Sequence, residues 1–562
     1  MLLCSLGVQS QEFYLGADLS YVNELKDCDA VYRNRSGEAV DPYELFSEEG
    51  ANIVRLRLWH DPKWTNYSNL EDIKISIGKA KANGMQVLLD FHYSDFWADP
   101  GRQWRPQAWE GIEDDELLGD SLYQYTYNTL FTLHQEGLLP EMVQIGNETN
   151  GNILIQRGET ELSGQSPDLY PIDWGRQSML MNHGIQAVQD IESQFDVDIK
   201  TMLHVANPID ARSWFEDASS NALVDYDIIG LSYYPQWHKL GVREVGEYIA
   251  DFKTRFGKDV MIVETGYPWT SNSLDQANNV LNFDSRLFTY SNNFSIDVQR
   301  DFMIELSWIV KENGGLGVIY WEPAWISSSC ATYWATGSHW ENATLFDFDG
   351  QLHRGADFLS YDYDQMPDAL QDQTVTFKVD MTSIETSNGV YVTGDFTGET
   401  NWQFLPMNEL ADNIFSYTTE IPGRSQGAYI FYNDDVWSNS SRETVPSNCA
   451  RLWNTHREYW VKGEQAEFFF SWGRCDQVPN EKILGFQEDA RITLFPTRAD
   501  RELKIQTEER IDHLELFDIG GSTNYQIKFK DQAIDVSHLT PGVYLLRIVL
   551  KDETVVQRFV KN

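Results

Sequence analysis

The sequence predicts an α/β protein in which a (β/α)8 barrel is followed by two small all-β sandwich domains. Over residues 11–360, apolar runs of strand length alternate with segments of helical periodicity, the pattern of a parallel barrel. From residue 374 onward the chain instead has short alternating strands separated by turns. A doubly wound open sheet is the alternative for the first part, but no glycine-rich phosphate loop follows the first apolar run.

Eight strands and five helices are predicted in the barrel. The strands are expected at 13–18, 52–58, 85–91, 142–146, 200–205, 226–232, 259–263 and 316–321. The helices are expected at 70–83, 117–136, 175–194, 242–256 and 298–313. Eight strands alternating with helices within about 350 residues fit the usual size of this barrel, with long loops.

Composition limits the classes of function. The 562 residues exceed what one hydrophobic core supports, and no apolar run reaches the roughly 18 residues of a membrane helix, so no transmembrane segment is expected. The net charge of −43 disfavours nucleic acid and anionic membranes as partners. The 19 Trp and 27 Tyr give many flat rings with polar rims, which suit the faces of sugars.

The amino terminus predicts secretion. Residues 1–10, MLLCSLGVQS, have the apolar and small residues of a signal-peptide remnant, although the basic segment is missing. A start further upstream, a lipidated Cys4 and an ordinary frayed terminus are the alternatives.

Two predicted strands end in glutamate. Glu148 follows the fourth strand, directly after Asn147, and Glu264 ends the seventh. In barrels of this kind the carboxyl ends of the strands carry the chemistry. Cleavage of a glycosidic bond needs two carboxyl groups, one to protonate the leaving oxygen and one to attack or to activate water. A solvated loop acid is the alternative for either residue alone, so the case depends on what the neighbouring strands contribute.

The other strand ends also present polar and aromatic residues. Candidates for substrate binding are Arg57, Asp90, His92, Asp95, Asn147, His204, Tyr233 and Glu322, and the same strand ends also carry Arg55 and Tyr234. Trp97, Trp104, Trp237, Trp321 and Trp325 are candidate sugar-stacking platforms, with core packing as the alternative for each. The histidines lack metal-ligand spacing and the five cysteines form no CxxC pair, so no metal site is expected. Such a concentration of polar groups at one end of the barrel predicts an active site.

Six segments together resemble glycoside hydrolase family 53, the arabinogalactan endo-β-1,4-galactanases. They are VRLRLWHDP, LLDFHYSDFWADPGRQWRPQAW, VQIGNETNG, GLSYYPQWH, VETGYPW and YWEPAW, and the resemblance extends over residues 14–359. It implies a retaining barrel enzyme in which Glu148 is the general acid/base, Glu264 is the nucleophile and Asn147 holds the sugar 2-hydroxyl. It also implies an arginine and a tyrosine beside the nucleophile, for which Arg57 and Tyr233 are expected and Arg55 is the competing arginine.

The chemistry agrees with these roles. Retention requires carboxyl groups about 5 to 5.5 Å apart, one neutral and one ionised. An arginine would keep Glu264 anionic, whereas a neighbouring carboxylate and apolar tryptophans would raise the pKa of Glu148. Glu322 ends the strand adjacent to that of Glu264, so it is expected to bond substrate or a loop.

No cofactor is expected. Some bacterial family members hold calcium after the seventh strand, but here the corresponding loop, WTSNSLDQANN, has only Asp275 as an acid, so calcium is not supported. Cys28 follows the first strand and Cys330 the last, and closure makes these strands neighbours, so a disulfide is expected, with free thiols as the alternative.

The carboxyl-terminal third divides into a linker at 361–373, a β-sandwich at 374–476 and a second sandwich at 483–562. The first sandwich resembles starch-binding-like modules through VTFKVDM and GDFTGETNW. Trp437, Trp453 and Trp460 are its candidate glycan contacts, a spacer role is the alternative, and Cys449 and Cys475 are expected to pair. The second resembles the type IX secretion sorting domain through IDVSHLTPGVYLLRI, which implies the secretion machinery as a partner. A plain β-sandwich module is the alternative.

The predicted function is a secreted or cell-surface retaining endo-β-1,4-galactanase whose partner is the polysaccharide β-1,4-galactan. The alternatives are a clan relative that cuts mannan or cellulose, and a non-catalytic glycan-binding surface protein. The presence of both glutamates disfavours the non-catalytic alternative.

Overall fold

The computed structural model describes residues 13–157, 171–281 and 290–475, with short gaps, and beyond residue 475 chiefly the strands between 492 and 561. The gaps are 292, 334, 399–401, 412, 448, 451–454 and 464. The predicted signal segment 1–10 lies outside the described residues. The chain forms two compact units, one of which contains the barrel and the other most of the carboxyl-terminal sheets.

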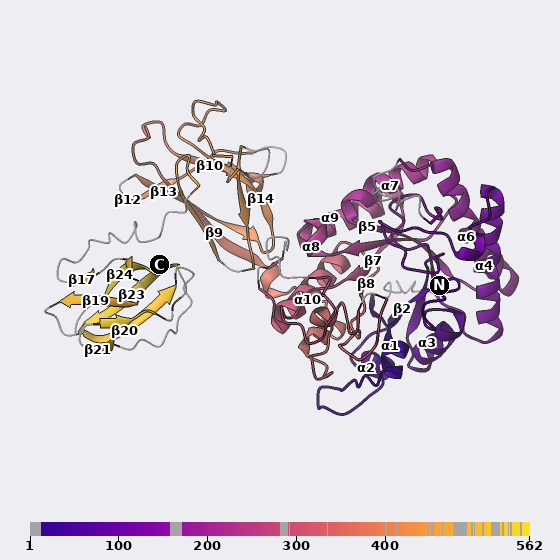
Figure 1. Cartoon of the computed structure of the whole chain (residues 1–562). Coiled ribbons are helices and arrows are strands. Elements are labelled where there is room, and N and C mark those ends of the chain that lie inside the picture. The colour runs from indigo at the N-terminus through magenta and orange to yellow at the C-terminus, as the bar shows by residue number, and fades with distance from the viewer. Residues whose placement is uncertain are drawn as a thin grey trace, which may run out of the picture. The chain divides into compact units, whose positions relative to one another are not determined.

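The first unit is a closed barrel of parallel strands in the order β1 to β8, which confirms the predicted fold (Figure 1). The strands are β1 Tyr14–Asp18, β2 Ile53–Leu58, β3 Gln86–Phe91, β4 Met142–Ile145, β5 Lys200–Ala206, β6 Ile228–Tyr233, β7 Asp259–Thr265 and β8 Gly317–Tyr320. The barrel closes between β1 and β8, where Tyr14 pairs with Gly317. A Cβ atom on Gly317 would lie 2.3 Å from the carbonyl oxygen of Tyr14, so this closure requires glycine.

Helices cover the outside of the barrel, and the five predicted ones lie where expected (Figure 1). These are α3 Leu70–Ala82, α4 Asp115–Gln135, α6 Trp174–Phe195, α9 Val242–Phe256 and α10 Ile296–Glu312. Four further helices were not predicted: α1 Val22–Asp27, α2 Pro42–Glu48, α7 Pro208–Ser220 and α8 Pro235–His238. Helix α7 is capped by Asn207, whose side chain accepts a hydrogen bond from the Ile209 backbone N–H.

Two layers of apolar side chains hold the barrel together. Inside it lie Ile53, Leu88, Met142, Met202, Ile228, Met261, Val263, Leu316 and Ile319. A larger cluster fills the space between strands and helices. Strands β2 and β6 are buried along their whole length, as expected when both faces of a parallel sheet are covered. The rigid scaffold therefore fixes the strand ends from which the site is built.

A disulfide joins Cys28 and Cys330, whose Cα atoms are 5.4 Å apart and 302 residues apart in sequence. It links the segment after β1 to the segment after β8, as the closure of the barrel led us to expect.

The segment predicted as a linker packs on the barrel unit. Tyr363 and Leu370 are buried members of the barrel's apolar cluster, and the Tyr363 hydroxyl donates to the carbonyl of Phe358. The first strand of the next sheets, β9, begins at Asp372. The many acidic and polar residues of this segment predicted a linker, but two of its apolar side chains attach it to the barrel.

Four further sheets form the two predicted all-β parts. The first part has β9 Asp372–Asp380, β10 Tyr391–Gly394, β11 Leu405–Pro406, β12 Asn408–Ala411, β13 Ile414–Pro422, β14 Gln426–Tyr432, β15 Arg457–Trp460 and β16 Ala466–Ser471. Their orders are β11-β10-β14-β15 and β12-β13-β9-β16. A disulfide joins Cys449 and Cys475, as expected. The side chain of Trp437 is 58% exposed, whereas Trp453 lies outside the described residues.

The last part contains β17 Ile492–Phe495, β18 Arg498–Ala499, β19 Glu502–Thr507, β20 Ile511–Asp518, β21 Phe529–Lys530, β22 Ala533–Asp535, β23 Gly542–Leu550 and β24 Thr554–Lys561. They form sheets in the orders β17-β19-β22-β21 and β18-β24-β23-β20. Leu503, Ile505, Leu546 and Ile548 are among the residues of a separate small core.

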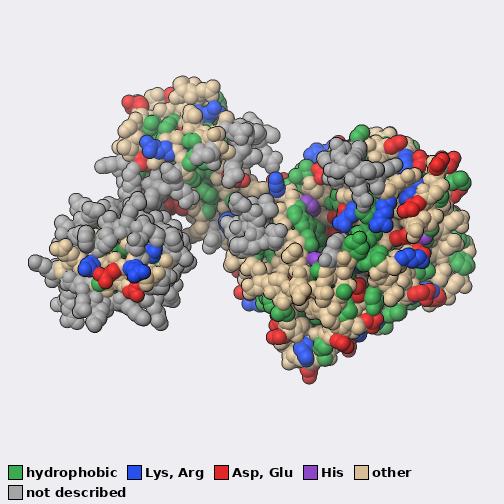
Figure 2. All heavy atoms as spheres, in the orientation of Figure 1, with side chains coloured by type: hydrophobic (Ala, Val, Ile, Leu, Met, Phe, Trp, Pro, Cys, Tyr) green, Lys and Arg blue, Asp and Glu red, His purple; other side chains and the backbone are tan. Residues whose placement is uncertain are grey.

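Acidic side chains are spread over the face of the barrel that Figure 2 presents, and basic side chains lie among them. None of the helices among the described residues has the length and apolar character needed to cross a bilayer.

Candidate active site

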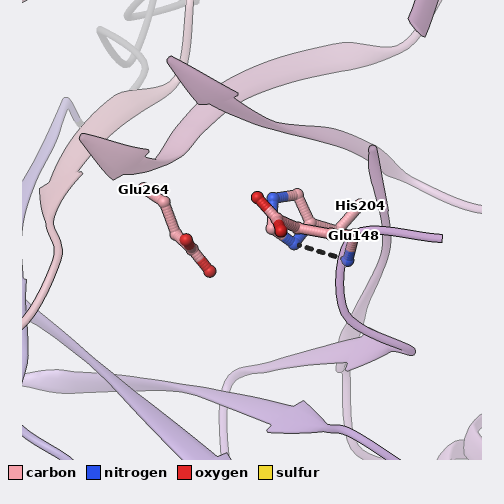
Figure 3. A group of neighbouring side chains, drawn as sticks. All are labelled: Glu148, His204 and Glu264. Carbon is pink, nitrogen blue, oxygen red and sulfur yellow. Dashed lines mark hydrogen bonds between the residues drawn. The ribbon is translucent and has the colours of Figure 1, made fainter. Parts of the chain in front are cut away.

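Glu148 and Glu264 face each other at the carboxyl end of the barrel (Figure 3). Glu148 lies just beyond β4 and Glu264 lies near the end of β7. A carboxylate oxygen of one lies within 4.8 Å of a carboxylate oxygen of the other. Glu148 has a φ of 46°, a left-handed conformation that non-glycine residues rarely adopt and that is concentrated at functional sites.

Arg55 carries the positive charge next to Glu264. Its Nη1 lies 2.8 Å from Glu264 Oε1 and 2.9 Å from Asp18, and its Nη2 lies 2.8 Å from Asp90. The Tyr234 hydroxyl donates to the other oxygen of Glu264 at 3.2 Å. Both interactions favour the ionised form of Glu264.

The expectation that Arg57 supports Glu264 is wrong. Arg57 instead lies 3.1 Å from Glu322, and its guanidinium is within 4.9 Å of the Tyr21, Trp59 and Trp97 ring centroids. Arg55 and Arg57 share a face of β2, so alternation could not separate them. Arg57 lies one step further along the strand, where it reaches past the end of β8 instead of across to β7.

The expectation that Tyr233 supports Glu264 is also wrong. The Tyr233 hydroxyl donates to the carbonyl of Leu240, and its ring packs near Phe302 of α10. Ser232 faces the barrel interior, so alternation along β6 turns Tyr233 toward the helices and returns Tyr234 to the interior. Register shifts between Leu231 and Ser232, where Ser232 pairs with Glu264, and such irregularities re-aim side chains near active sites.

The two glutamates have different electrostatic environments. Burial, followed by the charge of Glu264, raises the pKa of Glu148 well above its usual value. Burial also raises the pKa of Glu264, to about 7, with Arg55 and the Tyr234 hydroxyl acting in the opposite direction. Arg55 lies against Glu264, so the ionised form is favoured at Glu264, whereas the charge of Glu264 favours the protonated form of Glu148.

A cavity of about 470 Å³ surrounds this pair. Of the predicted site residues, Arg57, His92, Trp97, Asn147, Glu148, Trp237, Glu264 and Trp321 line it. Trp325 lines it as expected, together with Trp340, while Trp104 lies on a separate hollow. Aromatic walls with a few converging polar groups are typical of sugar-binding cavities.

Five residues expected to bind substrate are placed elsewhere. Asp90, His204, Tyr233 and Glu322 are fully buried behind the described wall of the cavity. Asp90 pairs with Arg55 and His92. Glu322 was expected to hydrogen-bond either substrate or a loop. It accepts hydrogen bonds from Arg57 and from the Tyr21 backbone N–H, which agrees with the second of these roles. Asp95 lines the separate hollow and accepts the backbone N–H groups of Asp61 and Gln107. Each of these carboxylates is satisfied by the protein itself.

Four residues of the site were not singled out from the sequence: Asp18, Gln144, Ser232 and Trp340. Gln144 donates to Asp90 at 2.6 Å and accepts from Arg55 at 3.2 Å, while Ser232 donates to Glu148 at 2.6 Å. Asp18 ends β1 in the same way that Glu264 nearly ends β7, which is the signal that could have identified it.

Glu148, His204 and Glu264 bring three potential metal ligands within 4.8 Å of one another (Figure 3). Nε2 of His204 is bonded to Ser232, however, and Nδ1 accepts from the Glu148 backbone N–H. At the loop after β7, Asp275 accepts hydrogen bonds from Ser327, Ser338 and Ala277. The residues present therefore do not fit a cation at either place.

The fold and this site define a barrel glycoside hydrolase with a carboxyl pair. The family model described as glycosyl hydrolase family 53 matches residues 14–359, and the chain belongs to that family. An arabinogalactan endo-β-1,4-galactanase of Cellvibrio japonicus is 47% identical over 335 residues, which are 60% of this chain and 86% of the relative. An endo-β-1,4-galactanase of Bacillus subtilis is 34% identical over 382 residues, covering 61% of this chain and 84% of the relative.

Solved structures agree with this assignment. The family 53 catalytic domain of Ignisphaera aggregans has a TM-score of 0.55 at 30% identity and covers 63% of this chain and 97% of its own. A fungal β-1,4-galactanase structure has a TM-score of 0.52 at 27% identity, with 62% and 99% covered. Residues 493–562 match the secretion system C-terminal sorting domain, so the chain is secreted or displayed at the cell surface.

Proposed function

We propose that the chain is an endo-β-1,4-galactanase that hydrolyses the β-1,4-galactan of pectic type I arabinogalactan with retention of anomeric configuration. The observation that carries this proposal is the carboxyl pair: Glu148 and Glu264 bring oxygens within 4.8 Å, in an aromatic cavity of a family 53 barrel. This separation is in the range of retaining enzymes, since inverting enzymes need about 6.5–9.5 Å for an intervening water. The names of the two relatives described above support galactan as the substrate.

Each glutamate has one role. In the first step Glu148 gives its proton to the glycosidic oxygen while ionised Glu264 forms a bond to the anomeric carbon and the leaving sugar departs. In the second step Glu148 takes a proton from water, the water oxygen bonds the anomeric carbon and the bond to Glu264 breaks. Arg55 and Tyr234 hold Glu264 in place for both steps, through contacts of 2.8 and 3.2 Å.

Substrate contacts follow from the cavity walls. Asn147 is held by Arg55, which donates to its Oδ1 at 2.7 Å, and by the carbonyl of Ala98, which accepts from its Nδ2 at 2.8 Å. It therefore has one amide orientation with which to hold the sugar 2-hydroxyl. Trp97, Trp237 and Trp321 are proposed as stacking surfaces.

The test is product analysis on linear β-1,4-galactan, with galactomannan and cellulose in parallel, for the wild type, Glu148→Ala and Glu264→Ala. We expect cleavage of galactan alone to short oligomers, with β-configured reducing ends in the first products by NMR. Loss of Glu148 should cost about 10²–10⁴-fold, and loss of the nucleophile at least as much. Cleavage of mannan or cellulose instead, or binding without hydrolysis, would refute the substrate or the catalytic proposal.

The middle sandwich is proposed as a glycan-binding module through the exposed ring of Trp437, which packs on Phe404 with ring centroids 4.2 Å apart. Depletion of Trp437→Ala from solution by insoluble galactan, compared with the wild type, tests this role. Equal depletion of the two proteins would favour the spacer alternative.

A further inference from the structure

A closed circuit of hydrogen bonds connects the side chain of Glu148 to its own backbone. Glu148 Oε1 accepts from the Ser232 hydroxyl at 2.6 Å, and Ser232 Oγ lies 2.9 Å from Nε2 of His204. Nδ1 of the same ring accepts from the Glu148 backbone N–H at 3.3 Å, the bond drawn in Figure 3. Ser232 and His204 have no exposed surface, so water does not compete for these bonds.

The proton positions follow from counting donors. An ionised Glu148 only accepts, so the single hydroxyl proton of Ser232 is donated to it, and Oγ must then accept from His204. Burial, followed by the charge of Arg55, lowers the pKa of His204 well below its usual value, so the ring is neutral. A neutral ring with its proton on Nε2 has a bare Nδ1, which matches the N–H of Glu148.

One contact opposes this tautomer. Nδ1 also lies 2.9 Å from Oδ1 of Asn147. That oxygen already accepts a charge-assisted hydrogen bond from Arg55 at 2.7 Å. Of the two protons on Gln144 Nε2, one goes to Asp90 at 2.6 Å, and the other is shared among the Gly146 carbonyl, Asn147 Oδ1 and Nδ1 of His204, at 3.0, 3.2 and 3.1 Å. A bare Nδ1 therefore accepts from the Glu148 backbone and lies beside this second N–H group.

We propose that Ser232 and His204 are positioning residues that keep Oε1 of Glu148 as a hydrogen-bond acceptor, so that the exchangeable proton of this carboxyl resides on its other oxygen. The inference rests on the proposed function of Glu148 as acid and base. In the first step the pair directs the proton away from Ser232 and toward the leaving group. In the second step it stabilises the carboxylate that takes a proton from water, while the protons of Ser232 and His204 stay in place.

The charged and titratable groups that face Glu148 come from several strands. Glu264 on β7 and Asp99 after β3 raise its pKa, Arg55 on β2 lowers it, and the hydroxyl of Tyr234 after β6 interacts with it. Among these interactions the Ser232 bond is a neutral contribution that lowers the pKa of Glu148. Its removal therefore shifts one group without changing the net charge of the site.

The experiment is the pH profile of kcat/KM on β-1,4-galactan for the wild type, Ser232→Ala and Ser232→Thr. Without the donor, the ionised form of Glu148 is less stable, so its pKa rises. The alkaline limb of the profile should move to higher pH by about one unit. Ser232→Thr keeps the hydroxyl and should return the limb toward the wild-type position. With an aryl galactoside whose leaving group needs no acid, the water-dependent second step should slow more than the first.

Two further variants complete the test. Ser178→Ala removes a buried hydroxyl of α6 that makes no hydrogen bond to any described residue, so its alkaline limb should match the wild type. His204→Gln retains a donor toward Ser232 and should move the limb less than Ser232→Ala. Thermal unfolding of each variant checks that it is folded.

An alkaline limb of Ser232→Ala that stays at the wild-type pH, with both steps slowed equally, would mean that Ser232 is merely structural and would overturn the inference. A wild type that leaves galactan uncut refutes the proposed function instead. The two failures are therefore distinguishable within one series.

Discussion

Arg55 is the residue on which the charge balance of the site depends. Its side chain is 1% exposed and pairs with the carboxylates of Asp18, Asp90 and Glu264. One guanidinium can stabilise three buried carboxylates because its planar group of N–H donors forms hydrogen bonds in several directions at once. A lysine supplies the charge from a single point and cannot reproduce these bonds.

We therefore expect Arg55→Lys to lower kcat/KM on galactan by at least about 100-fold, since one lost electrostatic contact to the reacting groups costs about 10²–10³. Glu264 should also titrate at higher pH, because the donor that favours its ionised form is weakened. The acidic limb of the pH profile reads this shift. The matched control is Arg57→Lys, whose partner is Glu322, and it should leave the acidic limb in place. If the acidic limbs of Arg55→Lys and Arg57→Lys lie at the same pH, Arg55 is not the arginine that stabilises ionised Glu264.

The activity of the wild type is expected to fall at both low and high pH. Glu264 must be ionised, so activity is lost as pH falls through its pKa, which burial raises to about 7. Glu148 must be protonated, so activity is lost as pH rises through its pKa, which burial and Glu264 raise well above the usual value. The expected result is a bell-shaped profile of kcat/KM with its acidic limb near neutral pH. Full activity persisting several pH units below this limb would contradict the environment described for Glu264.

At the scale of elements, the barrel is closed by the pairing of β1 with β8 and by the disulfide Cys28–Cys330. The disulfide joins the ends of a very long loop, for which the chain-entropy model gives the largest restriction of the unfolded chain. We expect its loss to leave the pairing of β1 with β8 and the cavity residues in place, because neither Cys28 nor Cys330 lines the cavity.

Cys28→Ser combined with Cys330→Ser should lower the free energy of unfolding by about 2–5 kcal/mol while kcat on galactan changes little. Denaturant unfolding followed by tryptophan fluorescence measures the first quantity. The pair Cys449→Ser and Cys475→Ser is the control, since it lies outside the barrel and should leave the unfolding of the barrel unchanged. If the double variant Cys28→Ser and Cys330→Ser unfolds at the same denaturant concentration as the wild type, the disulfide does not stabilise the barrel and strand pairing alone closes it.

At the scale of the whole molecule, catalysis and export are assigned to separate parts of the chain. The family 53 match ends at residue 359 and the sorting-domain match begins at residue 493. The last part has its own small apolar core, formed by residues such as Leu503 and Leu546. Its folding therefore does not require side chains of the barrel core.

Deletion of residues 493–562 should leave kcat and KM on galactan unchanged and should retain the protein inside producing cells that otherwise export it. Fusion of the same residues to a reporter that carries a signal peptide should direct the reporter to the medium or to the cell surface. Immunoblots of cell and medium fractions measure both effects. Export of the deleted chain at the wild-type level would contradict the sorting role.

By itself the sequence determined the barrel, the five main helices, and the positions of Glu148 and Glu264 at the ends of strands four and seven. These features are local, since they depend on hydrophobic periodicity and on where each apolar run stops. Helix α7 was missed although the sequence carries its signals, since Asn207 caps it, Pro208 occupies its first turn and its buried residues recur at helical spacing.

Only the tertiary structure decided which arginine and which tyrosine support Glu264, and that Ser232 and His204 stand behind Glu148. Alternation gives the face on which a side chain lies, but not its depth in the barrel or the register of one strand against the next. Arg55 and Arg57 share a face, and their partners Glu264 and Glu322 come from β7 and from beyond β8. The register shift beside Ser232 then sets which groups meet. Closure of the barrel, which no local pattern encodes, brings these strands together.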